Sequence, residues 1–251
     1  MAPLEVILVV LLAQATASLD KRFAEVEQLD LARAAAANDE EAARLTLVWL
    51  RVLNDVVERS MSDPNLSSRD HPWFGRQTET LFYNEIGGNW LINDQLVWKL
   101  HATYRETTAA DDLAWLAAQL PKGGECEGYV PCYMAVANAR SAEYLRRHPT
   151  GAHTDEAMRA IIEAIERVDE MLKDYPNLFE TSHCTDLMKE LAALEDAVQA
   201  ASGAEQAPTS EKIHELARRC EPRAFQSLTL VRSARDRMRF LSPQPLNSRP
   251  S

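Results

Sequence analysis

The chain of 251 residues is long enough to bury the core of one large domain or of two small ones. Its residues are 46% apolar and 26% charged, as in ordinary globular proteins, and the low count of 8 glycines favours helices over a sheet. The formal net charge of −11 argues against a nucleic-acid-binding protein, which would present a basic face.

The first residues have the pattern of a secretory signal peptide. An apolar run at 6–13 is followed by small residues at 15–17, of the kind found at a cleavage site. The run is shorter than the roughly 20 apolar residues that a transmembrane helix needs. Because the leader contains Glu5 and neither Lys nor Arg, a buried N-terminal helix is the alternative. We expect residues 1–17 to be a signal peptide, the protein to be periplasmic or extracellular, and the mature chain to lack a transmembrane segment.

Two helices are predicted next. Residues 20–37 are rich in alanine, leucine and charged side chains, and Asn38 then caps a second helix that has acidic residues in its first turn. The apolar stripe of this second helix comprises Leu45, Val48, Trp49, Val52, Leu53 and Val56. The helix is expected to end at 62–65, and a polar loop containing His71 and Pro72 to follow up to about residue 75.

Residues 80–92 carry aromatic side chains on both sides of Gly87 and Gly88. This is the one segment whose pattern fits a short β-hairpin. An irregular loop between helices is the other interpretation, and we favour the loop.

An internal similarity links residues 104–114 to residues 148–158, at an offset of 44 residues. Each copy follows a predicted helix, contains a tight polar turn, and enters another helix through acidic residues. Acidic side chains in a first turn stabilise the unsatisfied N–H groups and the positive end of the helix dipole. Repeated helix–turn–helix units are typical of an α-solenoid, and an ordinary helical bundle is the alternative.

The region at about 183–221 is predicted to form an antiparallel helical hairpin. Cys184 and Cys220 lie on the apolar faces of its two helices, and a turn-rich connector joins these helices at 201–208. The start of the first helix then lies beside the end of the second. We therefore expect a Cys184–Cys220 disulfide that staples the open end of the hairpin.

The other two cysteines, Cys126 and Cys132, flank a segment with Gly128 and Pro131 that can turn back on itself. A local disulfide is expected there, and an even number of cysteines after a leader supports export. The competing interpretation is a zinc site that also uses His183 and His214. It is disfavoured because neither cysteine pair has the short spacing of a zinc knuckle.

A final helix is predicted at 223–241, with an arginine-rich face that is expected to be solvated. The proline-containing tail at 242–251 is expected to be disordered. The helical domain therefore extends over residues 18–241.

The stretch 144–157, which contains His148-Pro149 and the acidic pair Asp155-Glu156, resembles the turn of tetratricopeptide-like repeats in bacterial cell-envelope proteins. The resemblance covers about residues 100–172, within repeat-like units at about 90–172. It implies a helical scaffold whose concave surface binds a protein or peptide partner. The period here is longer than the standard repeat, and the segment with Cys126 and Cys132 is inserted between the copies.

No phosphate-binding loop, dinucleotide fingerprint, nucleophile elbow or zinc-protease motif occurs in the sequence. Glu85 and His101 are the only catalytic candidates. They meet Tyr83 and Trp90 in a cleft if the loop before the helix of His101 folds back. An ordinary surface or structural histidine is the competing interpretation.

Taken together, the patterns predict an all-α fold of antiparallel helical hairpins, packed as a short α-solenoid or an irregular helical bundle. The predicted function is an exported scaffold that binds a protein or peptide in the cell envelope and uses no cofactor or metal. The alternative is a small-ligand binder or hydrolytic enzyme with a site near Glu85 and His101.

Overall fold

The computed structural model describes residues 19–63, 66–122, 125–175 and 181–220. The predicted signal peptide at 1–17, the predicted helix at 223–241 and the predicted tail at 242–251 lie outside the described residues.

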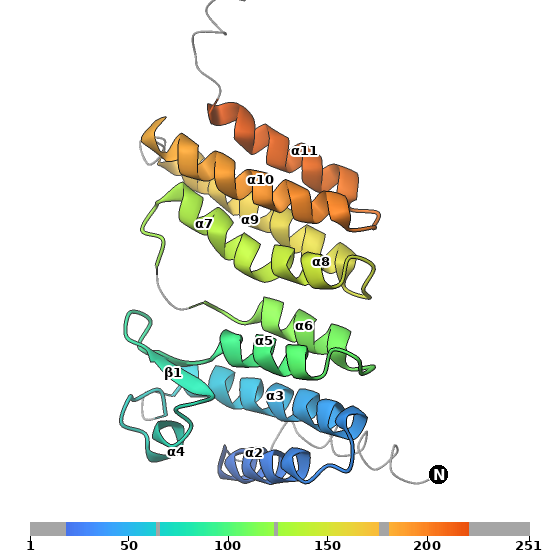
Figure 1. Ribbon diagram of the computed structural model, residues 1–251. Helices are drawn as coiled ribbons and strands as arrows, with labels where there is room; N and C mark the ends of the chain where they lie inside the picture. Colours follow the sequence, from blue (N-terminus) through green and yellow to red (C-terminus); the bar gives the residue numbers. More distant parts are fainter. Residues whose placement is uncertain (1–18, 64–65, 123–124, 176–180, 221–251) are drawn as a thin grey trace, which may run out of the picture.

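The described chain is mostly helical, as predicted, and its helices form antiparallel hairpins that follow one another along a stack (Figure 1). The longer helices are α2 (Leu19–Ala34), α3 (Asp39–Met61), α5 (Asp94–Thr103), α6 (Ala110–Gln119), α7 (Val130–Ala137), α8 (Glu143–Arg147), α9 (Thr154–Asp174), α10 (Cys184–Ala200) and α11 (Gln206–Ala217). A one-turn helix, α4 (Pro72–Gly75), lies within the segment predicted to be a loop. The hairpins are α2 with α3, α5 with α6, α7 and α8 with α9, and α10 with α11.

The helix α3 begins where the sequence predicts. The Asn38 side chain accepts a hydrogen bond from the Glu41 backbone N–H at 2.9 Å, which satisfies one of the free donors of the first turn. Trp49, Val52, Leu53 and Val56 of the predicted stripe are buried, whereas Leu45 and Val48 are only half-buried. This long buried face anchors the first hairpin and the segment that follows it.

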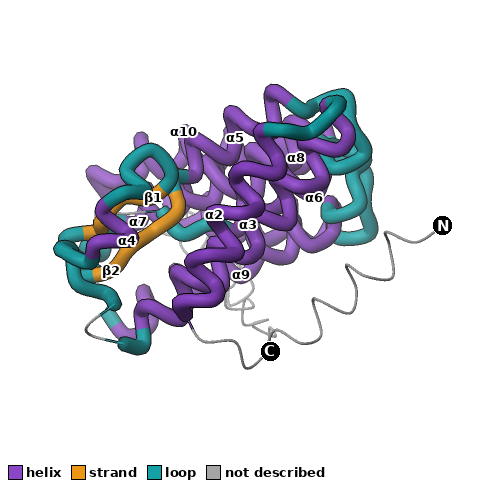
Figure 2. The backbone as a smooth tube through the Cα atoms, turned by 90° about the horizontal axis from the view of Figure 1, so that it is seen from below, coloured by secondary structure: helices purple, strands orange, loops and turns teal. Residues whose placement is uncertain are grey.

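Residues 81–92 form a β-hairpin, so the favoured loop interpretation was wrong. Strands β1 (Leu81–Asn84) and β2 (Asn89–Ile92) pair in antiparallel register. The left-handed backbone of Gly88, at φ 61°, closes the turn. Trp90, in β2, is buried in the core, and its indole N–H donates to the Ser68 carbonyl at 3.1 Å. These two contacts fix the position of β2. Figure 2 shows the strands at one edge of the stack.

The first helix of the third hairpin has a π-helical turn at Asn138–Ala142, between α7 and α8. The Asn138 side chain donates to the Glu190 carbonyl at 2.8 Å and so joins this turn to α10. The Arg140 guanidinium donates to the Ala118 carbonyl at 2.8 Å, where the last carbonyls of α6 need donors. The widened turn therefore aims two polar side chains at neighbouring helices.

Two clusters of buried apolar residues run through the stack. The first joins α2, α3, the β-hairpin, α5 and α6, and the second joins α6 to α11. Helix α6 belongs to both, because Leu113 and Ala117 face the first cluster while Ala114 and Ala118 face the second. Trp98 packs against both clusters. The hairpins therefore share a continuous interior.

Both predicted disulfides are confirmed. Cys126 is bonded to Cys132 and Cys184 to Cys220, with Cα atoms 5.5 Å and 5.4 Å apart. The ring of Tyr129, inside the first disulfide loop, lies 4.9 Å from the ring of His183, next to the second disulfide. The two bridges therefore secure the same end of the C-terminal hairpins.

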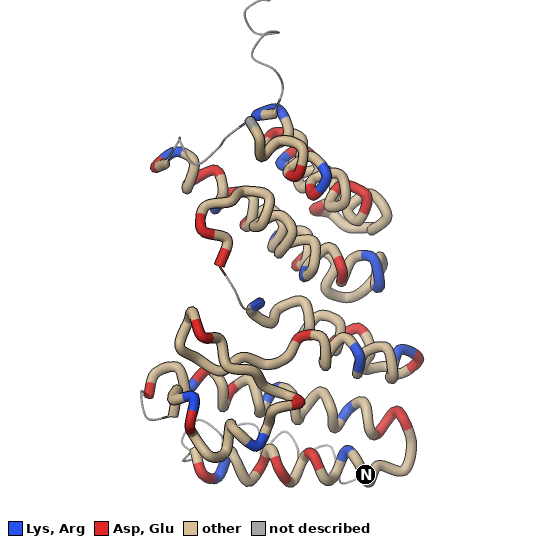
Figure 3. Tube along the Cα trace, turned by 60° about the vertical axis from the view of Figure 1, so that its left-hand side comes forward, with Lys and Arg blue, Asp and Glu red and all other residues tan. Residues whose placement is uncertain are grey.

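None of the helices within the described ranges is long and apolar enough to cross a membrane. Acidic and basic residues are distributed along the described helices from one end of the stack to the other (Figure 3).

Candidate functional site

The turns of the four hairpins lie along one side of the stack (Figure 1), and a cluster of polar and ionisable residues gathers there. The second and third hairpins meet in this cluster. Its members are His101 from α5, Asp111, Asp112 and Trp115 from α6, Tyr144 from α8, and His148 and His153 from the turn before α9.

Asp111 is at the centre of the cluster. Its Oδ1 accepts a hydrogen bond from the Tyr144 hydroxyl at 2.6 Å, and its Oδ2 accepts one from the Ala152 backbone N–H at 2.8 Å. The Tyr144 hydroxyl also accepts from the His153 backbone N–H at 3.0 Å. Burial and the bond to Asp111 raise the pKa of Tyr144, so the phenol remains a donor.

The same relationship recurs along the stack. Among the described residues, three acidic side chains at the second position of a helix each accept a backbone N–H from the turn of the following hairpin. The pairs are Glu40 with Thr108 at 3.1 Å, Asp111 with Ala152 at 2.8 Å, and Asp155 with Glu205 at 3.3 Å. We call this series the acid–turn ladder. It ties each hairpin to the next through the same chemistry.

Glycines allow the closest approaches in the ladder. A Cβ at Gly151 would collide with the Tyr144 hydroxyl and with Asp111 Oδ1, and would lie 2.9 Å from His148 Cβ. A Cβ at Gly203 would likewise collide with Asp155 Oδ1. Gly151 and Gly203 thus occupy corresponding places, where the turn backbone rests directly on a carboxylate.

The histidines of the cluster have different partners. His101 is only 5% exposed, and its Nε2 lies 2.8 Å from Nε2 of His148. Nδ1 of His148 faces Asp111 Oδ1 at 3.4 Å. Nδ1 of His101 is buried and has no hydrogen-bond partner within the described part of the chain. One buried imidazole nitrogen is therefore unsatisfied at the junction of two hairpins.

Burial, reinforced by His148 and then by Arg147, lowers the pKa of His101 from 6.5 to about 4. Burial also lowers the pKa of His148, although the Asp111 carboxylate opposes this shift. Both rings are therefore neutral at pH 7, and a hydrogen bond between two neutral rings is the stable arrangement.

His153 completes the cluster near the surface. Its Nε2 lies 3.0 Å from Asp112 Oδ1, its Nδ1 lies 3.2 Å from Glu156 Oε2, and its ring stacks on Trp115 at 5.3 Å. Both ring nitrogens thus face carboxylates, which holds the turn against α6.

The four residues of the predicted cleft have different surroundings. Tyr83 and Trp90 touch edge to face at 5.3 Å, and Trp90 is buried. Glu85 lies in the exposed turn of the β-hairpin and pairs with Arg69 at 2.5 Å. His101 contacts His148 instead. Of the four residues, only Tyr83 and Trp90 therefore lie together, while Glu85 and His101 each have a different partner.

The histidines of the zinc alternative have other contacts. All four cysteines are in disulfides, and within the described residues no three or more potential ligand side chains form a metal-binding group. Tyr129 packs against His183, and its hydroxyl donates to Asp186 at 2.5 Å. Nε2 of His214 lies 3.9 Å from Glu195 Oε1.

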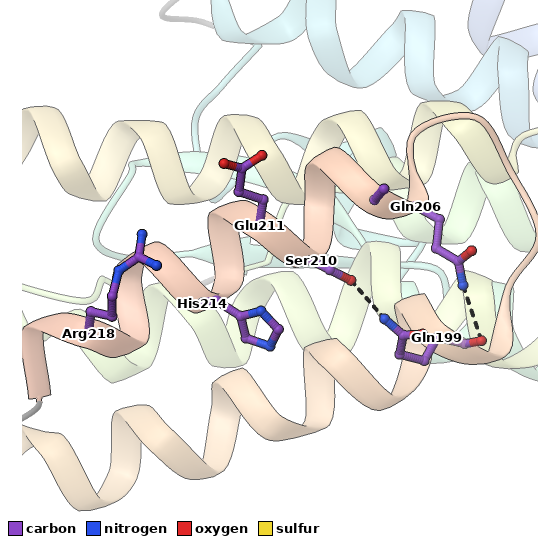
Figure 4. Close-up of a pocket in the computed structure, with 7 residues that line it drawn as sticks. Gln199, Gln206, Ser210, Glu211, His214 and Arg218 are labelled. Atoms are coloured by element: carbon purple, nitrogen blue, oxygen red, sulfur yellow. Dashed lines mark hydrogen bonds between the residues drawn. The ribbon is translucent and has the colours of Figure 1, made fainter.

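A surface groove of about 480 Å³ runs along the hairpin of α10 and α11 (Figure 4). It is lined by Gln199, Gln206, Ala207, Ser210, Glu211, His214 and Arg218. Ser210 and His214 are one helical turn apart, but the Ser210 hydroxyl accepts a hydrogen bond from Gln199 at 2.9 Å. The groove is polar and open, and it lies on the hairpin of α10 and α11.

The sequence pattern had located the turn of residues 148–158 but not its contacts. The 44-residue offset identified two copies, and the acidic residues were attributed to capping alone. The third turn, which contains Gly203, does not fit this offset, because the spacing from Gly151 to Gly203 is longer than 44 residues. A glycine in the tight polar turn before a helix, as at Gly151 and Gly203, is the signal that finds it.

Comparison of the chain with models of known protein families, with curated proteins and with solved structures yields no match.

Proposed function

We propose that the chain is an exported, non-enzymatic helical scaffold that binds a protein or peptide partner in the cell envelope. The acid–turn ladder is the observation that supports it most directly. A series of like contacts between successive hairpins is how a solenoid keeps its curvature along its length, and such stacks provide extended binding surfaces. The ladder also supports the predicted resemblance to tetratricopeptide-like repeats.

The two disulfides support the exported location. Disulfides form and persist in oxidising compartments and are rare in the reducing cytosol. Cys126–Cys132 and Cys184–Cys220 leave no free cysteine within the described residues. An even, fully paired set is what export through an oxidising compartment produces.

The geometry of the catalytic candidates favours the scaffold over the alternative of a ligand-binding or hydrolytic site. A general base must lie within reach of the group from which it takes a proton, and acid–base pairs usually share a cleft. Glu85 is paired with Arg69 on the surface, whereas His101 is buried against His148. No catalytic step is therefore assigned to either residue.

The test is partner capture from an envelope fraction of the source organism with the oxidised, folded protein as bait. The reduced and alkylated chain serves as the control for adhesion to unfolded protein. A captured partner is then purified, and its binding to the folded protein is measured by calorimetry, with saturable binding expected. Absence of a saturable partner would contradict the scaffold. Hydrolytic activity that is lost in both Glu85→Gln and His101→Gln would establish the alternative instead.

A further inference from the structure

The contact between His101 and His148 joins two hairpins. His101 lies in the last turn of α5, in the second hairpin, and His148 directly follows α8, in the third. The rings meet edge to face with their centres 5.0 Å apart, and the ring of Trp98 lies 6.0 Å from that of His101. A change at this contact therefore acts on the relative placement of the two hairpins.

Only one proton fits between the facing nitrogens. At 2.8 Å, one Nε2 must donate and the other must accept. A proton on Nδ1 of His148 lies toward the Asp111 carboxylate, 3.4 Å away, and leaves Nε2 of His148 as the acceptor. His101 is then the donor, and its buried Nδ1 carries no proton.

An additional proton has no favourable place in this arrangement. On Nδ1 of His101 it would be buried without an acceptor, and on Nε2 of His148 it would oppose the N–H of His101. Either ring would then be a cation near the Arg147 guanidinium, which contributes to lowering the pKa of both.

The acidic groups that face the pair are already occupied. Asp111, on α6, accepts from Tyr144 and from the turn backbone. Glu143, on α8, pairs with Arg146 at 3.4 Å and with Arg147 at 2.6 Å. An additional proton on either ring therefore places a cation beside carboxylates whose negative charge already serves other donors.

We propose that the His101–His148 pair is an acid-sensitive joint, which holds the second and third hairpins together at neutral pH and loosens when the surroundings become acidic. Loosening releases the turn of residues 148–153 from α5 and α6, and so changes the geometry of the stack where the ladder contact of Asp111 lies. This goes beyond partner binding, because it makes the shape of the stack respond to the pH of the compartment.

The sign and size of the effect follow from proton linkage. A histidine whose pKa falls on folding binds fewer protons in the folded state, so stability is complete above pH 6.5 and declines as the pH falls toward about 4. With these two values, protonation of His101 alone lowers the folding equilibrium constant about 30-fold between pH 7.5 and pH 5.

The test begins with the disulfide-intact protein itself. Titration of its imidazole resonances by NMR is expected to show a pKa of about 4 for His101 and a lowered pKa for His148. Hydrogen exchange, corrected for the intrinsic effect of pH, is expected to show faster opening of residues 148–153 than of α2 and α3 at pH 5. Ordinary titration of both rings near 6.5, or uniform exchange across the hairpins, would overturn the proposal.

A variant pair adds a second, independent measurement. His148→Gln retains a hydrogen-bonding side chain but removes the second ring, so the pKa of His101 is expected to rise and the acid-induced loss of stability to shrink. His214→Gln changes an exposed histidine and serves as the control, with the acid-induced loss unchanged. Equal acid sensitivity of the wild type and both variants would contradict the joint. If His148→Gln does not fold, the NMR titration of the unaltered protein decides.

Discussion

The hydroxyl of Tyr144 donates to Asp111 at 2.6 Å, across the boundary between the second and third hairpins, and the Tyr144 side chain is fully buried there. The same carboxylate accepts the Ala152 N–H. Asp111 thus satisfies a side chain and a backbone group that the next hairpin cannot satisfy by itself.

Replacing Asp111 with Ala is expected to lower the free energy of unfolding by about 2 kcal/mol, because it leaves the buried Tyr144 hydroxyl without its acceptor, while the exposed Ala152 N–H can turn to water. The measurement is urea unfolding of the disulfide-intact protein. Glu40→Ala changes the corresponding rung of the ladder, which is exposed, and is expected to cost less. Equal losses of stability for the two variants would show that the buried Tyr144 hydroxyl does not add to the strength of the Asp111 contact.

Gly151→Ala is expected to destabilise the protein by about 1–3 kcal/mol, because the new methyl group collides with Tyr144, Asp111 and His148. Gly75→Ala is the matched control. A Cβ at Gly75 meets nothing within 4 Å, and its replacement is expected to change stability by about 0.5 kcal/mol or less. Thermal unfolding of both variants checks the pair, and similar melting temperatures would refute the close approach at Gly151.

The two disulfides are expected to contribute unequally. Cys184 and Cys220 are 36 positions apart and Cys126 and Cys132 only 6. By the entropy of loop closure, replacing the first pair with serine is expected to cost about 4 kcal/mol and replacing the second about 2 kcal/mol. Denaturant unfolding of the two double variants without reductant gives the comparison. A larger loss on removal of the short loop would show that local structure, rather than chain entropy, dominates.

Much of the helical framework could be predicted because it depends on local signals. The cap at Asn38, the apolar stripe of α3 and the pairing of Cys184 with Cys220 follow from spacing along one helix or across one short connector. The disulfide prediction needed only the antiparallel geometry of the C-terminal hairpin. Contacts within one helix or one hairpin can be predicted from the spacing of residues along the chain.

The contacts between hairpins could not be predicted in the same way. His101 and His148 are 47 residues apart, and the rotation of one hairpin on the next decides whether their rings meet. A similar reason explains why the loop was favoured over the β-hairpin at residues 81–92. Its strands are short, and their stability comes from the burial of Trp90 against residues that precede it, which local propensity does not report.

The ladder also gives the stack a direction. Each rung has its carboxylate on the earlier hairpin and its amide on the later one, so the third hairpin carries both halves: the amide of Ala152 toward Asp111 and the carboxylate of Asp155 toward Glu205. A tandem duplicate of such a hairpin could therefore make the same carboxylate–amide contact with the hairpin before it and with the hairpin after it. At the start of α11 the corresponding position is Ala207, which has no carboxylate to offer a further turn. Proteins of this design can thus lengthen by internal duplication, and within the described residues the series of like contacts extends as far as the turn before α11.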